Sequence, residues 1–373
     1  MKSVRKNAFI VAINALVVCV LLALVAFVPP AIVDFYRLLR WHIVPSADPY
    51  SGLPNYANSP WSKKHFQEFA TLQSQYYDFI VWRSKAFNGE TVHIDDRGYR
   101  RHSETDFPSA DVWFFGGSVM WGYGDRDSET IPADVQQISG LRTFNFAEPG
   151  YVAHQSLELL MKAYLEGAHP KYVVFLDGIN DVWYKCLVNR AVYSSFYELP
   201  VRKYVEAGTR EDNGSQILSV FYPTTQAFEL LGTKIQNIFG KGQGTQLDEA
   251  TSYECQNNPQ KIHAIANALV ADWIVAKAIV EAHGGQFIPI LQPSAYIGTP
   301  NLTFLKSVRD NIAQRKQYEL VYPEIKKTLA EQHFQYFDFT KSFDGDGLYY
   351  IDAGHVSPNG NTVLAKEILT LLH

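Results

Sequence analysis

The decapeptide YVVFLDGIND, residues 172–181, decides the fold class of this 373-residue chain. It opens with five apolar residues and then turns at a glycine, which is typical of a strand buried on both faces of a parallel sheet. Four more runs of this kind lie at 111–116, 143–147, 286–291 and 334–339. Helical patterns lie between or after the runs, at 154–166, 259–283 and 358–372. This alternation predicts an α/β fold with helices on both faces of a five-stranded parallel sheet.

Polar residues that follow these runs are the candidate site residues, because ligands of a parallel sheet bind at the carboxyl ends of its strands. Ser118 follows the first run, Gly150 the second and Asn180 the third. A glycine permits a sharp turn, and an asparagine side chain offers N–H donors. Near the C-terminus Asp352 precedes His355 by three residues, so the carboxylate can hold Nδ1 and leave Nε2 as a general base. Taken alone, each block is a weak signal that a structural turn also explains.

Together and in this order, the four blocks resemble those of the SGNH hydrolase family, a branch of the GDSL esterases and lipases. The resemblance covers residues 111–373 and rests on Ser118 with Gly122, on Gly150, on Gly178-Ile179-Asn180-Asp181 and on Asp352-Ala353-Gly354-His355. It implies a three-layer α/β/α fold with a flavodoxin-like sheet, a catalytic triad of Ser118, His355 and Asp352, and no cofactor or metal. It also implies an oxyanion hole made by the backbone N–H groups of Ser118 and Gly150 and the side chain of Asn180.

One position departs from the family pattern. Gly117 stands where the usual Gly-Asp-Ser block has an aspartate. That aspartate is not a triad member, but its loss removes a group that can stabilise the serine turn. A non-catalytic protein that keeps the fold and binds or assembles glycans therefore stays open as an alternative. Trp121 and Trp183 follow two of the blocks, and each is a candidate either for the core or for the lining of a sugar or acyl groove.

Residues 8–28 form an uncharged, apolar segment of 21 residues, which is long enough to cross a bilayer as a helix. Lys2, Arg5 and Lys6 precede it, so the positive-inside rule places the N-terminus in the cytoplasm and the rest of the chain outside. The segment is too long for the apolar part of a cleaved signal peptide and is not followed by a small-residue cleavage site. The sequence therefore predicts a single-pass membrane protein with an extracytoplasmic catalytic domain, periplasmic or at the cell surface.

The expected organisation has three parts: an anchor with its juxtamembrane segment (1–40), a linker and cap-like entry segment (41–110), and the hydrolase-like domain (111–373) with an insertion at 186–257. The net charge is −5 and no block of Lys or Arg occurs, which argues against a nucleic-acid partner. The three cysteines form no CxxC pair, which argues against a zinc module. Cys186 and Cys255 flank the insertion, and a disulfide between them and two buried thiols both stay open.

The Gly-Gly-Ser turn, the anchor and the segment Val92–Gly98 together resemble membrane-anchored family members linked to bacterial surface polysaccharides. This resemblance implies a serine esterase or O-acyltransferase that acts on ester-linked acyl groups, with acetyl the expected one, of a cell-surface glycan. The expected substrate is an acylated glycan or a small ester. A membrane acyl-donor protein is an expected partner if the acyl group is transferred rather than hydrolysed.

Overall fold

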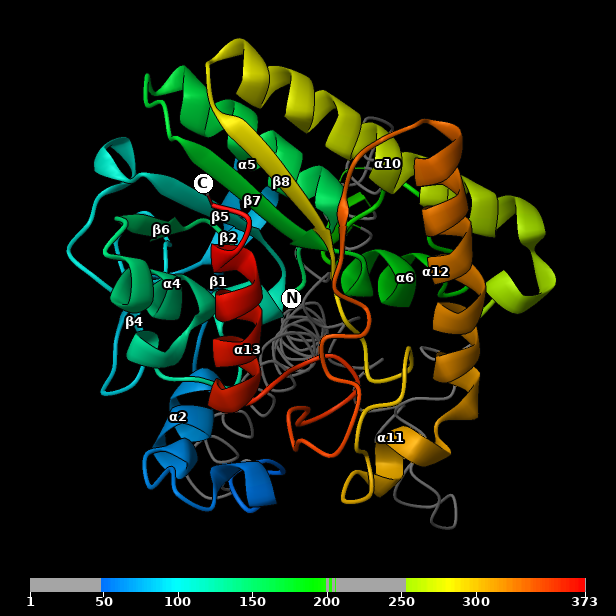
Figure 1. Cartoon of the computed structure of the whole chain (residues 1–373), viewed down its shortest axis with the longest axis horizontal. Helices are drawn as coiled ribbons and strands as arrows, with labels where there is room; N and C mark the ends of the chain where they lie inside the picture. Colours follow the sequence, from blue (N-terminus) through cyan, green and yellow to red (C-terminus); the bar gives the residue numbers. More distant parts are fainter. Residues whose placement is uncertain (1–47, 199–200, 203–204, 206–252, 373) are drawn as a thin grey trace, which may run out of the picture. The chain divides into compact units, whose positions relative to one another are not determined.

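The computed structural model describes residues 48–198, 201–202, 205 and 253–372 (Figure 1). The predicted membrane anchor at 8–28 and most of the predicted insertion at 186–257 lie outside the described residues. Residues 48–198 and 253–372 belong to one compact unit, which carries the candidate site.

A five-stranded sheet, parallel throughout, forms the centre of this unit and confirms the predicted α/β fold. Its strands are β5 (Val112–Gly116), β6 (Thr143–Asn145), β7 (Tyr172–Asp177), β8 (Gln286–Leu291) and β9 (Phe337–Asp338). They lie in the order β6-β5-β7-β8-β9, so the second strand is at one edge and the first lies beside it. This is the flavodoxin-like order, in which the chain reverses direction across the sheet next to the first strand.

The fifth strand is shorter than the sequence predicts. The apolar pattern begins at Phe334, but only Phe337 and Asp338 pair with β8. The backbone N–H of Phe334 instead donates to the carbonyl of Leu329, which closes the end of the preceding helix. The first residues of the run thus belong to a helix-terminating turn, and the edge strand begins after it.

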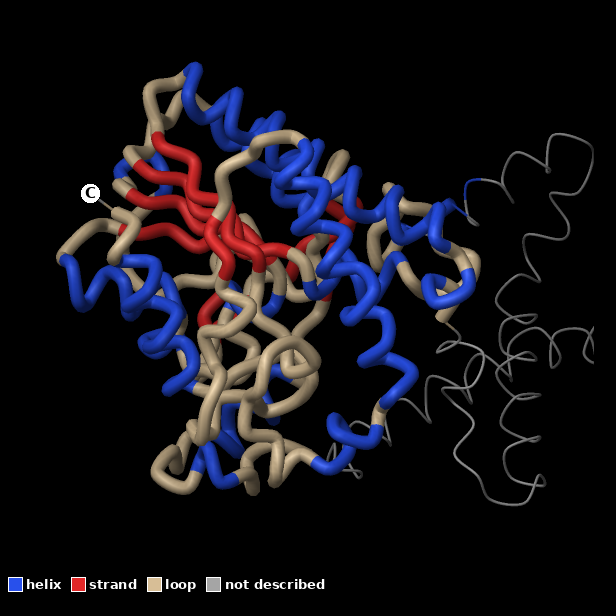
Figure 2. Tube along the Cα trace, turned by 45° about the vertical axis from the view of Figure 1, so that its right-hand side comes forward, coloured by secondary structure: helices blue, strands red, loops and turns tan. Residues whose placement is uncertain are grey.

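Helices cover both faces of the sheet (Figure 2). On one face α5 (Ala153–Leu165) and α12 (Ile312–Glu331) both contact α10 (Pro259–Ala282), and on the other face α4 (Ile131–Ser139) contacts α13 (Pro358–Leu369). The helices predicted at 154–166, 259–283 and 358–372 are confirmed as α5, α10 and α13. Helices α4 and α12 were not predicted, and α12 is interrupted in sequence by Pro323, which donates no backbone hydrogen bond.

The N-terminal part of the unit holds one helix and two antiparallel hairpins. Helix α2 (Ser62–Phe69) is followed by β1 (Ser74–Tyr77) with β2 (Val81–Ser84), and then by β3 (Phe87–Asn88) with β4 (His93–Ile94). The short helices of the unit are α3 (Ser118–Trp121), α6 (Ile179–Lys185), α11 (Lys306–Asp310), η1 (Pro54–Tyr56), η2 (Phe107–Ser109), η3 (Asp127–Glu129) and η5 (Cys255–Asn257).

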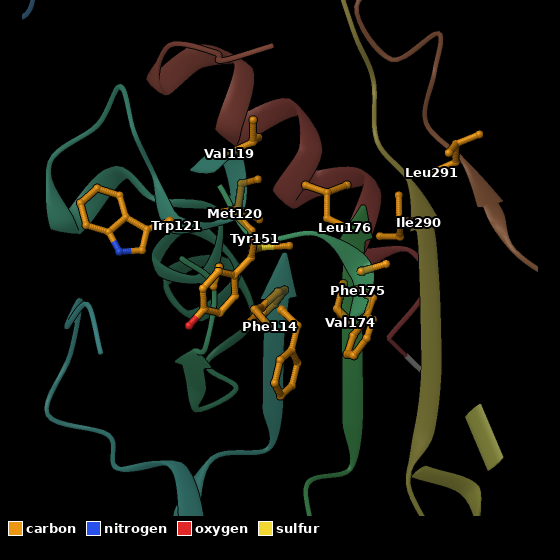
Figure 3. Close-up of a cluster of buried hydrophobic side chains, with 14 of the residues drawn as sticks. Phe114, Val119, Met120, Trp121, Tyr151, Val174, Phe175, Leu176, Ile290 and Leu291 are labelled. Atoms are coloured by element: carbon orange, nitrogen blue, oxygen red, sulfur yellow. The ribbon is translucent and has the colours of Figure 1, made fainter. Parts of the chain in front are cut away.

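The core is built on the apolar strands that the sequence indicated. Every residue of β5 and β7 is buried, as expected of strands covered on both faces. Side chains of the strands β5, β7 and β8 pack together there with those of α3, the short helix after β5 (Figure 3). Trp121 belongs to this core: it is fully buried, and the guanidinium of Arg100 lies 4.2 Å from its ring centroid. Of its two alternatives, core packing is therefore the one observed.

Within the described part of the chain, α10 is long and apolar enough to cross a membrane by length and composition. Its contacts explain the apolar composition differently. It packs against β8, α5 and α12, and Leu269 and Trp273 on it are fully buried in the core. A buried core helix can be as long and as apolar as a membrane-spanning one.

A disulfide joins Cys186 to Cys255, 69 residues apart. Of the two alternatives left by the sequence, pairing is the one observed. The backbone on either side of the bridge is also paired, because the N–H of Glu254 donates to the carbonyl of Cys186 at 2.9 Å. The two ends of the segment between them are thereby held side by side at the carboxyl end of α6.

Candidate active site

Ser118 is the first residue of α3 and is separated from the end of β5 by Gly117 alone. The turn before it passes through Gly116 (φ 149°) and Gly117, and α3 ends after one turn at Gly122 in the left-handed conformation. A Cβ atom at position 117 would lie 2.3 Å from Nδ2 of Asn180. A side chain at position 117, such as the aspartate of the family pattern, would therefore clash with Asn180, which occupies the space it would need.

Ser118, His355 and Asp352 form a continuous hydrogen-bonded relay. The Ser118 Oγ and His355 Nε2 atoms are 2.6 Å apart, and His355 Nδ1 and the Asp352 Oδ2 atom are 2.6 Å apart. Ser118 lies at the carboxyl end of β5, whereas Asp352 and His355 lie on the loop before α13. His355 is 237 residues away from Ser118 along the chain. The predicted triad residues are therefore brought within hydrogen-bond reach with no backbone movement.

The carboxylate of Asp352 is held by several donors. Its Oδ1 atom accepts the backbone N–H groups of Gly354 and His355 at 2.9 and 2.8 Å, and the hydroxyl of Tyr50 donates to Oδ2 at 3.3 Å. Burial acts to raise the pKa of Asp352, but the neighbouring His355 and these hydrogen bonds outweigh burial and hold it below its usual value. Asp352 is therefore ionised at neutral pH and fixes the tautomer of His355 that leaves Nε2 free to accept.

Tyr123, just after α3, packs on the imidazole ring, and residues of the entry segment support both Tyr123 and the relay loop. The ring of His355 stacks on that of Tyr123 with centroids 4.0 Å apart and 23° between planes. The carbonyl of Tyr123 is in turn 2.7 Å from Nε2 of His65 on α2. Asn55 donates to the carbonyls of Leu348 and Tyr350, just before the relay loop, at 2.9 and 3.0 Å. The entry segment thus packs directly behind the relay.

Three N–H groups are available as oxyanion donors. Among the described residues, the backbone N–H groups of Ser118 and Gly150 have no acceptor. Nδ2 of Asn180 donates one hydrogen to the carbonyl of Tyr151 at 2.8 Å and keeps the other free. Gly150 adopts φ 87°, a conformation that favours glycine. All three predicted donor residues line the same cavity as the relay.

The buried carboxylate of Asp181 ties the segment after the Gly150 turn to helix α6. Asp181 accepts the backbone N–H of Ala153 at 3.2 Å and pairs with Lys185 Nζ at 2.6 Å, and both side chains are buried. Because Ala153 follows the Gly150 turn and Asp181 follows Asn180, the hydrogen bond between Ala153 and Asp181 links the segments that carry two of the predicted oxyanion donors. His154 points elsewhere: its Nδ1 atom pairs with Asp272 at 2.9 Å, and it does not line the cavity.

The cavity in front of Ser118 has a volume of about 630 Å³. Trp183 lines it and also packs against the hydrophobic core, so both alternatives for this tryptophan stay open. The polar residues of the lining that the sequence analysis does not name include Glu148, after β6, and Gln292, directly after β8. Both occupy the strand-end positions that singled out Ser118 and Asn180, so the same rule applied to every strand would have found them.

Glu148 is fully buried and poorly satisfied. The hydroxyl of Ser84 donates to its Oε1 atom, whereas Oε2 has no partner among the described residues. Burial raises the pKa of Glu148 to about 7, against the opposing influence of Arg83 and Ser84. Within residues 48–198 and 253–372, no three His, Cys, Asp or Glu side chains are grouped to hold a metal ion.

No protein-family profile matches this chain, and no curated protein matches it. Several solved structures resemble it. A member of the lipolytic G-D-S-L family from Veillonella parvula has 14% identity and a TM-score of 0.34, over 70% of this chain and 96% of that one. An acetyl xylan esterase has 14% identity and a TM-score of 0.36, over 70% of this chain and 99% of that one. A GDSL-like lipase from Bacteroides thetaiotaomicron has 14% identity and a TM-score of 0.34, over 72% of this chain and 91% of that one. Values this low say nothing about the substrate or reaction of this chain.

Proposed function

We propose that this chain is a membrane-anchored, extracytoplasmic serine esterase or O-acyltransferase, which acts on ester-linked acyl groups, acetyl foremost, of a cell-surface glycan. The observation that supports the chemistry is the relay from Ser118 Oγ through His355 to Asp352, with 2.6 Å at each step. A serine hydroxyl is a weak nucleophile unless an adjacent base removes its proton, and this arrangement supplies that base and its orienting carboxylate.

The reaction follows from these atoms. Ser118 Oγ forms a bond to the ester carbonyl carbon as its proton moves to Nε2 of His355. The tetrahedral intermediate collapses, the bond to the alcohol oxygen breaks, and His355 returns the proton to the departing alcohol. The oxygen of water or of a sugar hydroxyl then attacks the acyl-serine carbonyl as His355 removes its proton. The bond between the acyl carbon and Ser118 Oγ breaks, and His355 returns the proton to Oγ. Water gives hydrolysis, and a sugar hydroxyl gives acyl transfer.

The negative charge that develops on the carbonyl oxygen needs donors that are already in place. The N–H groups of Ser118 and Gly150 and the second Nδ2 hydrogen of Asn180 have this role in the proposal. Their environment fits it, since the turn that carries Gly150 is tied by Asp181 to the helix that carries Asn180. Donors that do not reorganise during the reaction are worth several kcal/mol each in such sites, roughly 10²–10³ in turnover.

The proposed location rests on two features. Residues 8–28 are long and apolar enough to span a bilayer, with basic residues before them. The Cys186–Cys255 disulfide is typical of proteins outside the cytoplasm, where thiols are not kept reduced. A membrane acyl-donor protein is the partner expected if the reaction is a transfer.

The proposal is tested by turnover of p-nitrophenyl acetate with the full chain in detergent micelles, beside Ser118→Ala and His355→Ala. We expect turnover by the parent that both substitutions abolish, and covalent labelling of the parent by a fluorophosphonate at Ser118 alone. Turnover that survives Ser118→Ala would contradict the proposal. So would a parent that is neither active nor labelled, which would favour a non-catalytic glycan-binding or assembly protein.

A further inference from the structure

One wall of the Ser118 cavity is aromatic and begins at the oxyanion glycine. A Cβ atom at Gly150 would lie 3.3 Å from Cζ2 of Trp82 and 4.0 Å from Cβ of Phe196. Trp183 and Phe196 have nearly parallel rings, 22° apart with centroids separated by 5.7 Å. Trp82 meets the ring of Tyr197 edge to face at 5.0 Å. The four rings thus form one continuous surface, the aromatic wall, beside the predicted carbonyl-binding position.

Two rings of the aromatic wall remain open to solvent. Phe196 is 38% exposed and Tyr197 is 40% exposed, although both line the cavity. Their neighbour Trp183 is half-buried and also lines it. Large aromatic side chains gathered at the mouth of a catalytic cavity are a surface on which an apolar ring face can pack.

Gln292 contributes a fixed polar group to the same cavity. Its backbone N–H donates to the carbonyl of Asp177 at 2.9 Å, and its carbonyl accepts the hydroxyl of Tyr322 at 3.0 Å. The residue is only 5% exposed, yet among the described residues its side-chain amide has no hydrogen-bond partner. Such an amide offers a donor and an acceptor at one place, which matches the hydroxyl groups of a sugar.

We propose that this cavity is a pyranose subsite, in which a sugar ring packs its C–H face on the aromatic wall and pairs a hydroxyl with the amide of Gln292. The subsite rests on the proposed function, because it places the acylated oxygen of that sugar at Ser118. A long acyl chain is the competing occupant. It would cover the Gln292 amide without pairing it, and leaving a buried amide unpaired is costly.

Binding to the catalytically blocked chain separates the subsite from the reaction. The full chain with Ser118→Ala is titrated by calorimetry, in detergent micelles, with partly O-acetylated tetrasaccharides of xylose, glucose, mannose and N-acetylglucosamine. We expect at least one of them to bind. Adding Trp183→Ala or Gln292→Leu should weaken that binding about tenfold or more. Gln292→Leu keeps the side-chain volume, so it removes the amide without opening a cavity.

Tyr193→Ala is the matched control, because Tyr193 is an exposed aromatic residue of the same segment as Phe196 that does not line the cavity. It should leave tetrasaccharide binding within twofold. Failure of the Ser118→Ala chain to bind any tetrasaccharide overturns the subsite. Equal affinity in the Gln292→Leu and Tyr193→Ala chains overturns it as well.

Kinetics with Ser118 intact decide between a sugar and a long acyl chain. For Gln292→Leu we expect kcat/KM to fall about tenfold more on the acetylated tetrasaccharide than on p-nitrophenyl octanoate. A variant that gains on octanoate and loses nothing on the tetrasaccharide identifies an acyl pocket and overturns the subsite. If the parent cleaves no ester but Ser118→Ala binds a tetrasaccharide through Trp183, the esterase proposal fails and the subsite stands.

Discussion

The loop after β9 and the loop after β6 each bring a carboxyl group to the Ser118 cavity, and the two groups differ in what surrounds them. Asp352 accepts hydrogen bonds from two backbone N–H groups, from His355 and from Tyr50. Glu148 accepts one from Ser84, and its other oxygen has no partner among the described residues. The pKa of Asp352 lies below its usual value, whereas that of Glu148 is raised to about 7.

Burial alone therefore does not set the charge of a carboxyl group at this site. Burial acts to raise the pKa of both groups. Hydrogen-bond donors and the imidazole of His355 reverse the effect of burial at Asp352, whereas Ser84 and the guanidinium of Arg83 do not reverse it at Glu148. Asp352 is therefore an anion that can orient a base, whereas Glu148 stays largely neutral below about pH 7.

Replacing the ionised carboxyl should have the largest effect on turnover. Asp352→Asn keeps the shape but loses the acceptor that holds the Nδ1–H of His355, so the ring can take the wrong tautomer. We expect kcat on p-nitrophenyl acetate to fall about 10³–10⁴-fold. Asp96→Asn, a change at an exposed aspartate, is the control. A loss smaller than tenfold would show that Asp352 does not act through His355.

Removing the side-chain amide of Asn180 should have the next largest effect on turnover. Asn180→Ala removes the free Nδ2 hydrogen that the proposed mechanism assigns to the oxyanion. We expect a loss of about 10²–10³ in kcat with little change in KM. A variant whose KM rises while kcat is preserved would instead assign Asn180 to ground-state binding.

The poorly satisfied carboxyl should be visible in the pH dependence of stability. The folded-state pKa of Glu148 is raised from its ordinary value near 4.5 to about 7. Between these two pH values the folded protein keeps a proton on Glu148 that the unfolded chain has released. Its contribution to stability is complete below about 4.5 and is lost as the pH rises through about 7, which amounts to roughly 3 kcal/mol.

Glu148→Gln should remove that dependence, since a glutamine does not ionise. Thermal unfolding at pH 5 and pH 8 measures it, with the exposed Glu104→Gln as control. We expect the parent and Glu104→Gln to lose more stability than Glu148→Gln between the two pH values. An equal loss in all three chains would mean that Glu148 is already ionised at pH 5.

The smallest effect is expected at the outermost donor to Asp352. Tyr50→Phe removes only the hydroxyl at 3.3 Å, while the two backbone donors remain. We expect kcat on p-nitrophenyl acetate to fall about two- to fivefold. A drop of a hundredfold would indicate that the entry segment, and not the relay loop, holds Asp352 in place.

Local sequence pattern was enough to predict the sheet and the edge at which the candidate site lies. Strands β5 and β7 are continuous apolar runs, so their burial on both faces can be predicted from local composition. Because parallel strands end at one edge, residues as distant as Ser118 and Asn180 could be placed at that edge before any contact was known. The short β9 and the unpredicted α12 show the limit, since a helix-ending turn and Pro323 both obscure the local pattern.

The tertiary structure alone decided what surrounds the relay. It placed Tyr50 and Tyr123 against Asp352 and His355, joined Cys186 to Cys255, and left the Gln292 amide and one Glu148 oxygen without partners among the described residues. None of these follows from periodicity, because each depends on segments far apart in the chain meeting in space. Local pattern specifies which residues a strand end presents, whereas the charge, satisfaction and accessibility of those residues depend on their neighbours in the fold.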